Sequence, residues 1–299
     1  MFRIVLRVIT MLVLGLIVAL VATVLWIGIA SQRKIEQRYG VDAAEVPVPQ
    51  DSASLARGRH LYRSISCALC HGEDGGGTIY FQSATMGTVT GSNLTSGRGG
   101  VAGWRSDLDW VRAIRHGVKP DSTSLLVMPS EVFVHLSDSD LGAILAYLRS
   151  LPAVDRELPA SKFGPMGRVL LATGRMNILV ASKTPPYEPP PPVEPGPTPE
   201  YGRYLANISG CHGCHGFGLS GGAVAGPPGL PPASNLTPAG LRHYSEEDFG
   251  RAMREGIRPG GAPIDEFMPW RAYQHMSDDD LAALWAYLKS VPPRPFGGK

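Results

Sequence analysis

The stretch Cys67-Ala68-Leu69-Cys70-His71 decides how this chain is organised, because it places two thiols two residues apart with an imidazole directly after the second. This order is the attachment signature of a c-type haem. Each cysteine can form a thioether with one vinyl group of the porphyrin, and the histidine is then placed beneath the iron as its proximal ligand. The same order returns at Cys211-His212-Gly213-Cys214-His215. The sequence therefore predicts two covalently attached haem c groups, held by Cys67, Cys70, His71, Cys211, Cys214 and His215.

Two other kinds of site use the same spacing of cysteines. Two such pairs could hold one zinc ion through four thiolates, but Cys70 and Cys211 are far apart in the chain, and a zinc site needs no histidine after each pair. A thioredoxin-like redox pair would want a βαβ context, whereas the flanks here are rich in glycine and helix-forming residues. The two motifs use all 4 cysteines of the chain. No cysteine is left for a disulfide or a catalytic nucleophile.

Composition limits the remaining possibilities. A length of 299 residues is enough for two domains, and 36 glycines with 27 prolines indicate loop-rich domains. The formal net charge is only +2, with no basic stripe of the kind that binds nucleic acid. We expect no nucleic-acid partner.

The N-terminal segment contains an uncharged run of 23 residues from Val8 to Ala30. A helix of about 20 apolar residues can cross a bilayer, so residues 1–34 are predicted to be a transmembrane anchor. The alternative is a cleaved signal peptide, because Gly28-Ile29-Ala30 offers small residues at a cleavage point. The run is longer than a usual signal sequence core, which favours the anchor.

The two halves of the chain repeat one another. Ser54 and Thr198 lie equally far before the two haem motifs, and each can N-cap a helix. After each motif comes a glycine-rich loop with the sequence Ser-Asn-Leu-Thr, at residues 92–95 and 234–237. We expect this repeat to serve the fold, through polar contacts that include a haem propionate.

Two further helices follow in each half. Ser106-x-x-Asp109 and Ser245-x-x-Asp248 resemble capping boxes that begin a second helix, and a third helix begins at residues 137–140 and 277–280. The third helices carry apolar residues at positions i, i+3, i+4 and i+7, so one face of each is predicted to be buried. Between the second and third helices, both halves contain Met-Pro, at residues 128–129 and 268–269.

Residues 154–195 are expected to connect the halves. Residues 163–182 could form a short apolar helix, in which Arg168 and Arg175 argue against a second membrane crossing. Nine of the fifteen residues from Pro185 to Pro199 are proline, which predicts an extended, semi-rigid spacer.

Each half resembles a class I cytochrome c domain, in its capped helix before CxxCH, its Met-Pro loop, and its final helix reading LAYLRSLP or LWAYLKSVP. The resemblance covers residues 51–153 and 196–293. It implies a mainly α fold, with two tandem class I cytochrome c domains at 51–153 and 196–299 behind the transmembrane helix. The loop from Gly72 to Thr95 departs from the pattern, because it lacks the proline often found near the proximal histidine.

The resemblance also implies the distal iron ligands. In this family a methionine completes the iron coordination, and Met128 and Met268 match it. Histidines outside the two haem-binding positions are expected to be surface or helix-flanking residues; these are His60, His116, His135, His212, His243 and His275.

As a whole the chain resembles membrane-anchored cytochrome c subunits of periplasmic dehydrogenases or terminal oxidases. This implies a carrier that passes single electrons from a dehydrogenase or quinol-oxidising complex to a terminal acceptor, and it favours an electron-transfer protein or a subunit of an oxidoreductase complex over an enzyme in its own right. The alternative is a di-haem enzyme of the peroxidase type, in which one iron opens a coordination site. Haem is attached to CxxCH motifs outside the cytoplasm, so we expect a single-pass protein of the bacterial inner membrane whose haem domains face the periplasm.

Overall fold

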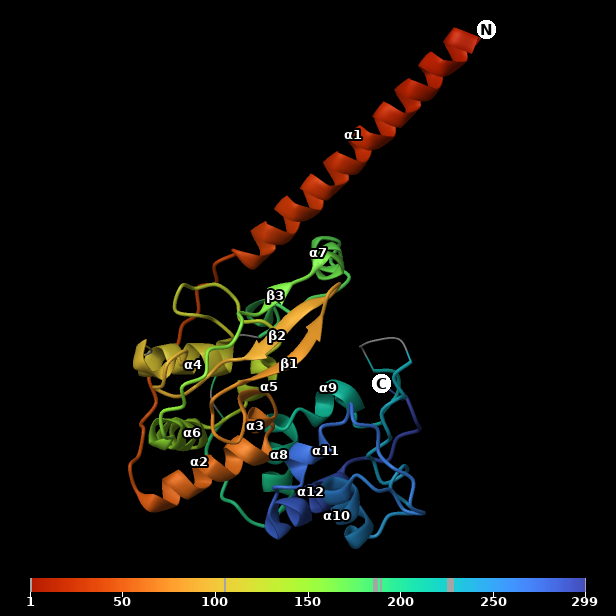
Figure 1. The fold of residues 1–299 in the computed structure, drawn as a ribbon. Coiled ribbons are helices and arrows are strands. Elements are labelled where there is room, and N and C mark those ends of the chain that lie inside the picture. Colours follow the sequence, from red (N-terminus) through yellow and green to blue (C-terminus); the bar gives the residue numbers. More distant parts are fainter. Residues whose placement is uncertain (1, 105, 185–187, 189, 225–228, 299) are drawn as a thin grey trace.

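The computed structural model describes the whole chain except residues 1, 105, 185–187, 189, 225–228 and 299. One long helix, α1 (Phe2–Ile35), rises from a compact body that holds the rest of the chain (Figure 1). Its apolar side chains are largely exposed, with Leu12 and Leu16 68% and 71% accessible. By length and composition α1 could cross a membrane, and no second helix in the described ranges meets that test.

The first half of the body is built from helices around the first haem motif. They are α2 (Ser52–Ser64), α3 (Cys67–His71), the short 3-10 turn η1 (Ala102–Trp104), α4 (Asp107–His116), α5 (Ser130–Phe133) and α6 (Asp138–Ser150). A buried core of aliphatic and aromatic side chains joins α2, α4 and α6, and includes Leu61, Trp110, Ile114, Leu141 and Leu145. The three helices expected from the repeat are therefore present.

The second half follows the same order. Its helices are α8 (Pro199–Ile208), α9 (Cys211–His215), α10 (Glu246–Glu255), α11 (Trp270–Tyr273) and α12 (Asp278–Ser290). The core again joins the first, second and last long helices, through Leu205, Phe249, Met253, Leu281 and Leu284. The expectation of a mainly α fold with two repeated domains is confirmed.

Most of the predicted helix ends are confirmed. Ser106 and Ser245 form capping boxes with Asp109 and Asp248, and Thr198 caps α8 by accepting from the backbone N–H of Tyr201. The prediction for Ser54 is wrong, because Asp51 is the N-cap of α2 and accepts from the backbone N–H of Ser54. Aspartate serves as well as serine at this position.

In each domain the first and last long helices cross in direct backbone contact. A Cβ atom on Gly58 of α2 would lie 2.0 Å from the carbonyl oxygen of Ala143 in α6. Gly202 of α8 has the same relation to Ala283 of α12, also 2.0 Å. Both crossings therefore require glycine, since any side chain would push the helices apart.

A small antiparallel sheet was not predicted. Strands β1 (Thr78–Ser83) and β2 (Gly87–Gly91) form a hairpin, and β3 (Lys162–Phe163) pairs with β2. The hairpin occupies most of the loop expected between Gly72 and Thr95. It packs on the haem motif, where Thr78 Oγ1 donates to the carbonyl of Cys70 at 2.9 Å and Gly91 approaches that carbonyl too closely for a Cβ.

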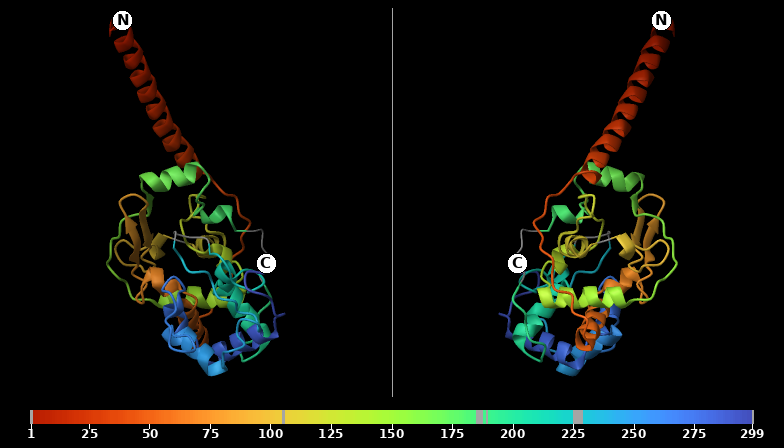
Figure 2. Two further views of the ribbon diagram at one scale, coloured as in Figure 1. Left: turned by 90° about the vertical axis from the view of Figure 1, so that its right-hand side faces the viewer. Right: turned by 90° about the vertical axis from the view of Figure 1, so that its left-hand side faces the viewer.

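The predicted short helix between the domains is α7 (Pro165–Ala172), followed by a single 3-10 turn, η2 (Val180–Ser182). Helix α7 lies against the C-terminal end of α1 (Figure 2). Lys34 Nζ donates to the carbonyl of Leu171 at 2.8 Å, and Arg168 Nη1 contacts Ser31 Oγ and Gln32 Oε1 at 3.1 Å each. These bonds hold the base of α1 against the body.

The proline-rich spacer falls partly outside the described residues, at 185–187 and 189. Residues 190–195 have no regular secondary structure. The spacer does not keep the domains apart, because α5 contacts α8 and α11 contacts α2 across the domain boundary.

Candidate functional site

The two haem motifs fold into matching five-residue helices, α3 and α9. Each is preceded by a residue in the left-handed conformation, Ser66 with φ 76° and Gly210 with φ 75°. Each is followed by a glycine with positive φ, at Gly72 and Gly216. The chain therefore turns sharply into and out of each motif, which places both cysteines and the histidine of a motif on one short helix.

The proximal histidines are held alike in the two domains. The Nδ1 atoms of His71 and His215 lie 2.8 Å and 2.7 Å from the carbonyl oxygens of Ser92 and Ser234. A carbonyl only accepts, so Nδ1 carries the proton and Nε2 is left as a metal-binding nitrogen. Burial lowers the pKa of both imidazoles, which favours the neutral form that binds iron.

The repeated Ser-Asn-Leu-Thr loops hold the carbonyls of Ser92 and Ser234 in place beside the histidines. Asn93 Nδ2 donates to the carbonyl of Val154 at 2.7 Å, and Asn235 Nδ2 donates to that of Arg294 at 2.8 Å. The threonine hydroxyl, at Thr95 or Thr237, donates to the asparagine side chain at 2.8 Å. The expected role in the fold is confirmed. These protein contacts account for the repeat, so no propionate contact is needed to explain it.

The missing proline in the first domain does not leave His71 unsupported. Ser92, the carbonyl partner of His71, directly follows strand β2, whose hairpin packs against α3. The second domain lacks this hairpin in its described residues, and Pro231 and Pro232 precede its matching carbonyl at Ser234. Two different loops thus give the same hydrogen bond.

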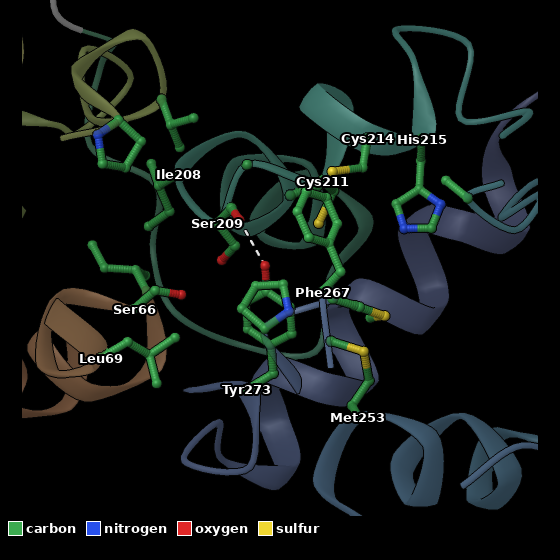
Figure 3. Close-up of a pocket in the computed structure, with 18 of the residues that line it drawn as sticks. Ser66, Leu69, Ile208, Ser209, Cys211, Cys214, His215, Met253, Phe267 and Tyr273 are labelled. Atoms are coloured by element: carbon green, nitrogen blue, oxygen red, sulfur yellow. Dashed lines mark hydrogen bonds between the residues drawn. The ribbon is translucent and has the colours of Figure 1, made fainter. Parts of the chain in front are cut away.

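All eight predicted site residues line one continuous cavity of about 990 Å³. Figure 3 shows its second-domain side, with Cys211, Cys214 and His215 above Met253 and Tyr273. Most of the lining is apolar, which suits a porphyrin ring. The cavity brings together the motif residues Cys67, Cys70, His71, Cys211, Cys214 and His215 with the methionines Met128 and Met268.

The two methionine loops differ in backbone geometry. Val127, immediately before Met128, has φ 65°, and the N–H of Met128 donates to the carbonyl of Leu126 at 2.8 Å. This is a γ-turn around a β-branched residue with positive φ, which is a strained arrangement. The N–H of Met268 instead donates to the carbonyl of Asp265 at 3.1 Å. The first loop also pairs with the inter-domain segment, through Val127 N–H and the Ile178 carbonyl.

The surroundings of the cysteines do not fit an activated redox pair or a four-cysteine zinc site. Burial raises the pKa of Cys67 and Cys211 to about 12 and that of Cys70 to about 11. An activated redox cysteine has a lowered pKa, which these thiols lack. In addition, no group of three or more Cys, His, Asp or Glu side chains among the described residues is arranged to hold a metal ion. The zinc and thioredoxin alternatives therefore lose support.

Sequence reasoning missed two tyrosines that line the cavity. Tyr62 Oη donates to the carbonyl of Gly72 at 2.6 Å, just after the first motif. Tyr273 Oη donates to the carbonyl of Ser209 at 2.9 Å, just before the second motif. Both side chains are buried. They are not at matching places in the repeat, so the repeat gave no signal for them.

Comparison with known families divides the chain as the repeat does. Residues 53–148 match the model described as cytochrome c oxidase, cbb3-type, subunit III. Residues 200–292 match the model described as cytochrome c. Each matched range begins near the helix before a haem motif and ends near the last helix of its domain.

Several characterised proteins are similar over most of the chain. It is 28% identical over 281 residues to the cytochrome c subunit of the quinone alcohol dehydrogenase of Gluconobacter oxydans, which covers 83% of this chain and 56% of that protein. It is 28% identical over 270 residues to the gluconate 2-dehydrogenase cytochrome c subunit of Pantoea cypripedii, covering 81% and 60%. The chain thus spans less than two thirds of the length of these dehydrogenase subunits.

A third relative is closer in length. It is a diheme cytochrome c-type protein of Cereibacter sphaeroides, 29% identical over 277 residues, covering 81% of this chain and 87% of that protein.

Proposed function

Starting from a chain that contains two tandem cytochrome c domains, each binding a covalently attached haem c, we propose that it passes single electrons from a membrane-associated dehydrogenase to a further acceptor. The observation that carries this is the single cavity lined by both CxxCH motifs and both Met-Pro loops. A haem whose two axial positions are filled can exchange electrons but offers no open position to a substrate.

We propose Met128 and Met268 as the distal ligands of the first and second haems. Both are partly buried and pack against the core, and both lie in the cavity with the proximal histidines. In each domain the ligand is held by the start of a short helix, because α5 and α11 begin two residues after the methionine. When bound, haem supplies the ferrous–ferric couple, and the chain supplies its attachment, its ligands and its apolar surroundings.

The proposed donor is the catalytic subunit of a dehydrogenase, because relatives that are similar over most of this chain are named as cytochrome c subunits of such enzymes. The chain would then serve as the electron-transfer subunit of a larger complex. A quinol-oxidising complex or a terminal oxidase could take the place of donor or acceptor. Purification of the native complex from its membrane, followed by identification of its subunits, tests this assignment.

The proposed location is the bacterial inner membrane, with α1 as a single span and the haem domains on the periplasmic side. The contact between α1 and α7 supports a body that is held close to the bilayer. Arg33 at the end of α1 is exposed, and Arg168 bonds to that end of the helix. Cations at this level suit the headgroup region of anionic lipids.

The ligand assignment is tested by replacing Met128 with histidine. Covalent attachment depends on Cys67 and Cys70, so the variant should still carry both haems. Imidazole is a stronger donor than a thioether and favours ferric iron, so the midpoint potential of the first haem should fall. Met268→His should lower only the second potential, and Met166→His, on the exposed side of α7, is the control. Unchanged midpoint potentials in both Met128→His and Met268→His would show that these methionines do not bind the irons.

One observation favours the enzymatic alternative at the first haem. The positive φ of Val127 stores strain next to Met128, and such strain costs about 1–3 kcal/mol and is found at sites that change conformation. A rearrangement of this loop that let Val127 leave the strained conformation would move Met128 with it and open the first iron. Addition of cyanide to the fully oxidised chain tests this, because cyanide binds ferric haem: a displaceable ligand gives tight binding at one haem only, whereas two firmly bound methionines resist displacement.

A further inference from the structure

The two domains meet through equivalent surfaces. The first helix of each domain contacts the short helix after the Met-Pro loop of the other, so α2 lies against α11 and α8 lies against α5. Gly210, between α8 and α9, faces Val132 of α5, which lies 3.3 Å from the position of a Cβ on that glycine. This is the pattern of an isologous contact, in which one surface meets its own copy across a two-fold axis.

Two aspartates at the start of the last helices anchor this contact. Asp140 and Asp280 occupy the same position in α6 and α12, and both are buried, at 8% and 3% accessible. Each is held from within its own domain. Arg57 binds Asp140 through Nε and Nη2 at 2.9 and 2.8 Å, and Tyr201 Oη donates to Asp280 at 3.0 Å.

Each aspartate is also bound from the other domain. His60 Nε2 lies 2.7 Å from Asp280 Oδ2, and Tyr204 Oη donates to Asp140 Oδ2 at 2.7 Å. His60 and Tyr204 occupy matching positions in α2 and α8, one turn after Arg57 and Tyr201. The cross-domain bonds are therefore related by the same two-fold symmetry as the helices.

The symmetric halves are joined at the centre. Arg57 Nη1 donates to Tyr201 Oη at 2.8 Å, so a continuous chain of bonds runs from Asp140 to Asp280. Tyr201 is fully buried and Tyr204 is 5% accessible. Separation of the domains would break the bonds from His60 and Tyr204 to the aspartates and the bond from Arg57 to Tyr201. The arrangement thus disfavours any separation of the domains.

The haem cavity runs across this interface. Figure 3 shows Ser66 and Leu69 of the first domain near Ile208 and Ser209 of the second, and all four line the same cavity. Ser66 and Leu69 flank or belong to the first haem motif, and Ser209 lies two residues before the second. The relative position of the domains therefore sets the relative position of the two haem sites.

We propose that Arg57, His60, Asp140, Tyr201, Tyr204 and Asp280 form an interdomain lock that fixes the spacing of the two haem sites, so that an electron entering one domain is handed to the other within the same chain. This inference rests on the proposed electron-transfer function. The transfer oxidises one iron and reduces the other, and no bond or proton on the chain changes. The six residues are positioning residues, because they act through the separation of the sites.

The test measures the magnetic dipolar coupling between the two oxidised haems in the full chain, purified in detergent. The variants are His60→Ala, Tyr204→Phe and the double variant, which together remove both cross-domain bonds to the aspartates. Ser245→Ala is the control, because it removes a capping hydrogen bond to the backbone N–H of Asp248 that lies wholly within the second domain and away from the cavity lining. Absorption spectra and haem content establish that each variant is folded and loaded.

We expect the wild-type chain and the control to give one narrow distribution of haem-to-haem coupling. The double variant should lose it and give a broad, weaker distribution, with the absorption spectrum of each haem unchanged. An unchanged narrow distribution in the double variant would overturn the lock while leaving the proposed function intact. Failure of the wild-type haems to take up one electron each would instead defeat the proposed function.

Discussion

Replacement of Gly202 by alanine tests the helix crossing on which the second domain is built. The added Cβ would lie 2.0 Å from the carbonyl oxygen of Ala283, where contacts of this kind require at least 3.0 Å. The obstacle is backbone, so no side chain can rotate away, and α8 must move from α12 by about 1 Å. Overpacking of this kind typically costs about 1–3 kcal/mol.

Helix propensity acts in the opposite direction. Alanine is better than glycine inside a helix by about 1 kcal/mol, so a glycine without tertiary contacts should gain stability on replacement. Gly250, within α10, has nothing within 4 Å of its Cβ position and provides this matched control. The middle of the overpacking range less this gain leaves a fall of about 1 kcal/mol in the free energy of unfolding for Gly202→Ala, which corresponds to roughly 5 °C in Tm for a domain of this size.

Thermal unfolding of the haem-loaded chain, followed by circular dichroism, separates the two effects by their sign. Gly202→Ala should unfold earlier than the wild type, and Gly250→Ala should unfold later. Gly58→Ala should behave like Gly202→Ala, because its Cβ meets the carbonyl of Ala143 at the same distance. A rise in Tm for Gly202→Ala, similar to that of Gly250→Ala, would refute the close crossing.

Two further predictions concern the turn before the haem motif and the behaviour in acid. Ser66 has a left-handed backbone conformation, and glycine has it at the matching position, Gly210. In denaturant unfolding, Ser66→Gly should therefore stabilise the chain by about 1 kcal/mol and Gly210→Ser should destabilise it. The opposite signs would contradict a left-handed conformation at these two positions. Burial raises the pKa of Asp280, but the hydrogen bond and charge of His60, with Ser277, outweigh it and leave a pKa of about 2. This pKa lies below its unfolded value, so the ionised Asp280 stabilises the fold by about 2 kcal/mol above pH about 4, and this stabilisation is lost as the pH falls towards 2. Asp280→Asn should lack this pH-dependent part of the unfolding free energy. Equal dependence of stability on pH in the two proteins would contradict the prediction.

Local signals in the sequence were sufficient for the parts of the fold that depend on short-range chemistry. Capping by Ser106 and Ser245 and the positive φ of Gly117 and Gly256 involve residues within one helix turn, so their pattern predicted the boundaries of α4 and α10. The haem motifs are likewise local. The error at Ser54 arose because serine and aspartate are equally good caps three residues apart.

The sequence of the hairpin β1–β2 does contain a pattern that favours a strand. Thr78-Ile79-Tyr80-Phe81 is a run of β-branched and aromatic residues, and such runs favour strands. The surrounding glycines made the region read as a loop. Several of these glycines serve close backbone contacts instead, as at Gly91 against Cys70.

The contact between the domains had no local signal. His60 and Asp280 are 220 residues apart, and Arg57 and Tyr201 are 144 apart. The histidine was expected to be a surface or helix-flanking residue. Its role depends on the docking of two domains, which the proline-rich spacer does not specify.

A redox titration of the purified full chain distinguishes an electron carrier with two haems ligated by histidine and methionine from a chain with an open iron. The titration counts electrons per chain while the absorbance band at the red edge, which marks methionine bound to ferric iron, is followed for each haem. We predict that each chain takes up two electrons. The band should be present for both oxidised haems and should be lost as each haem is reduced. A band from only one haem, or a second iron that is open in the oxidised chain, would contradict it.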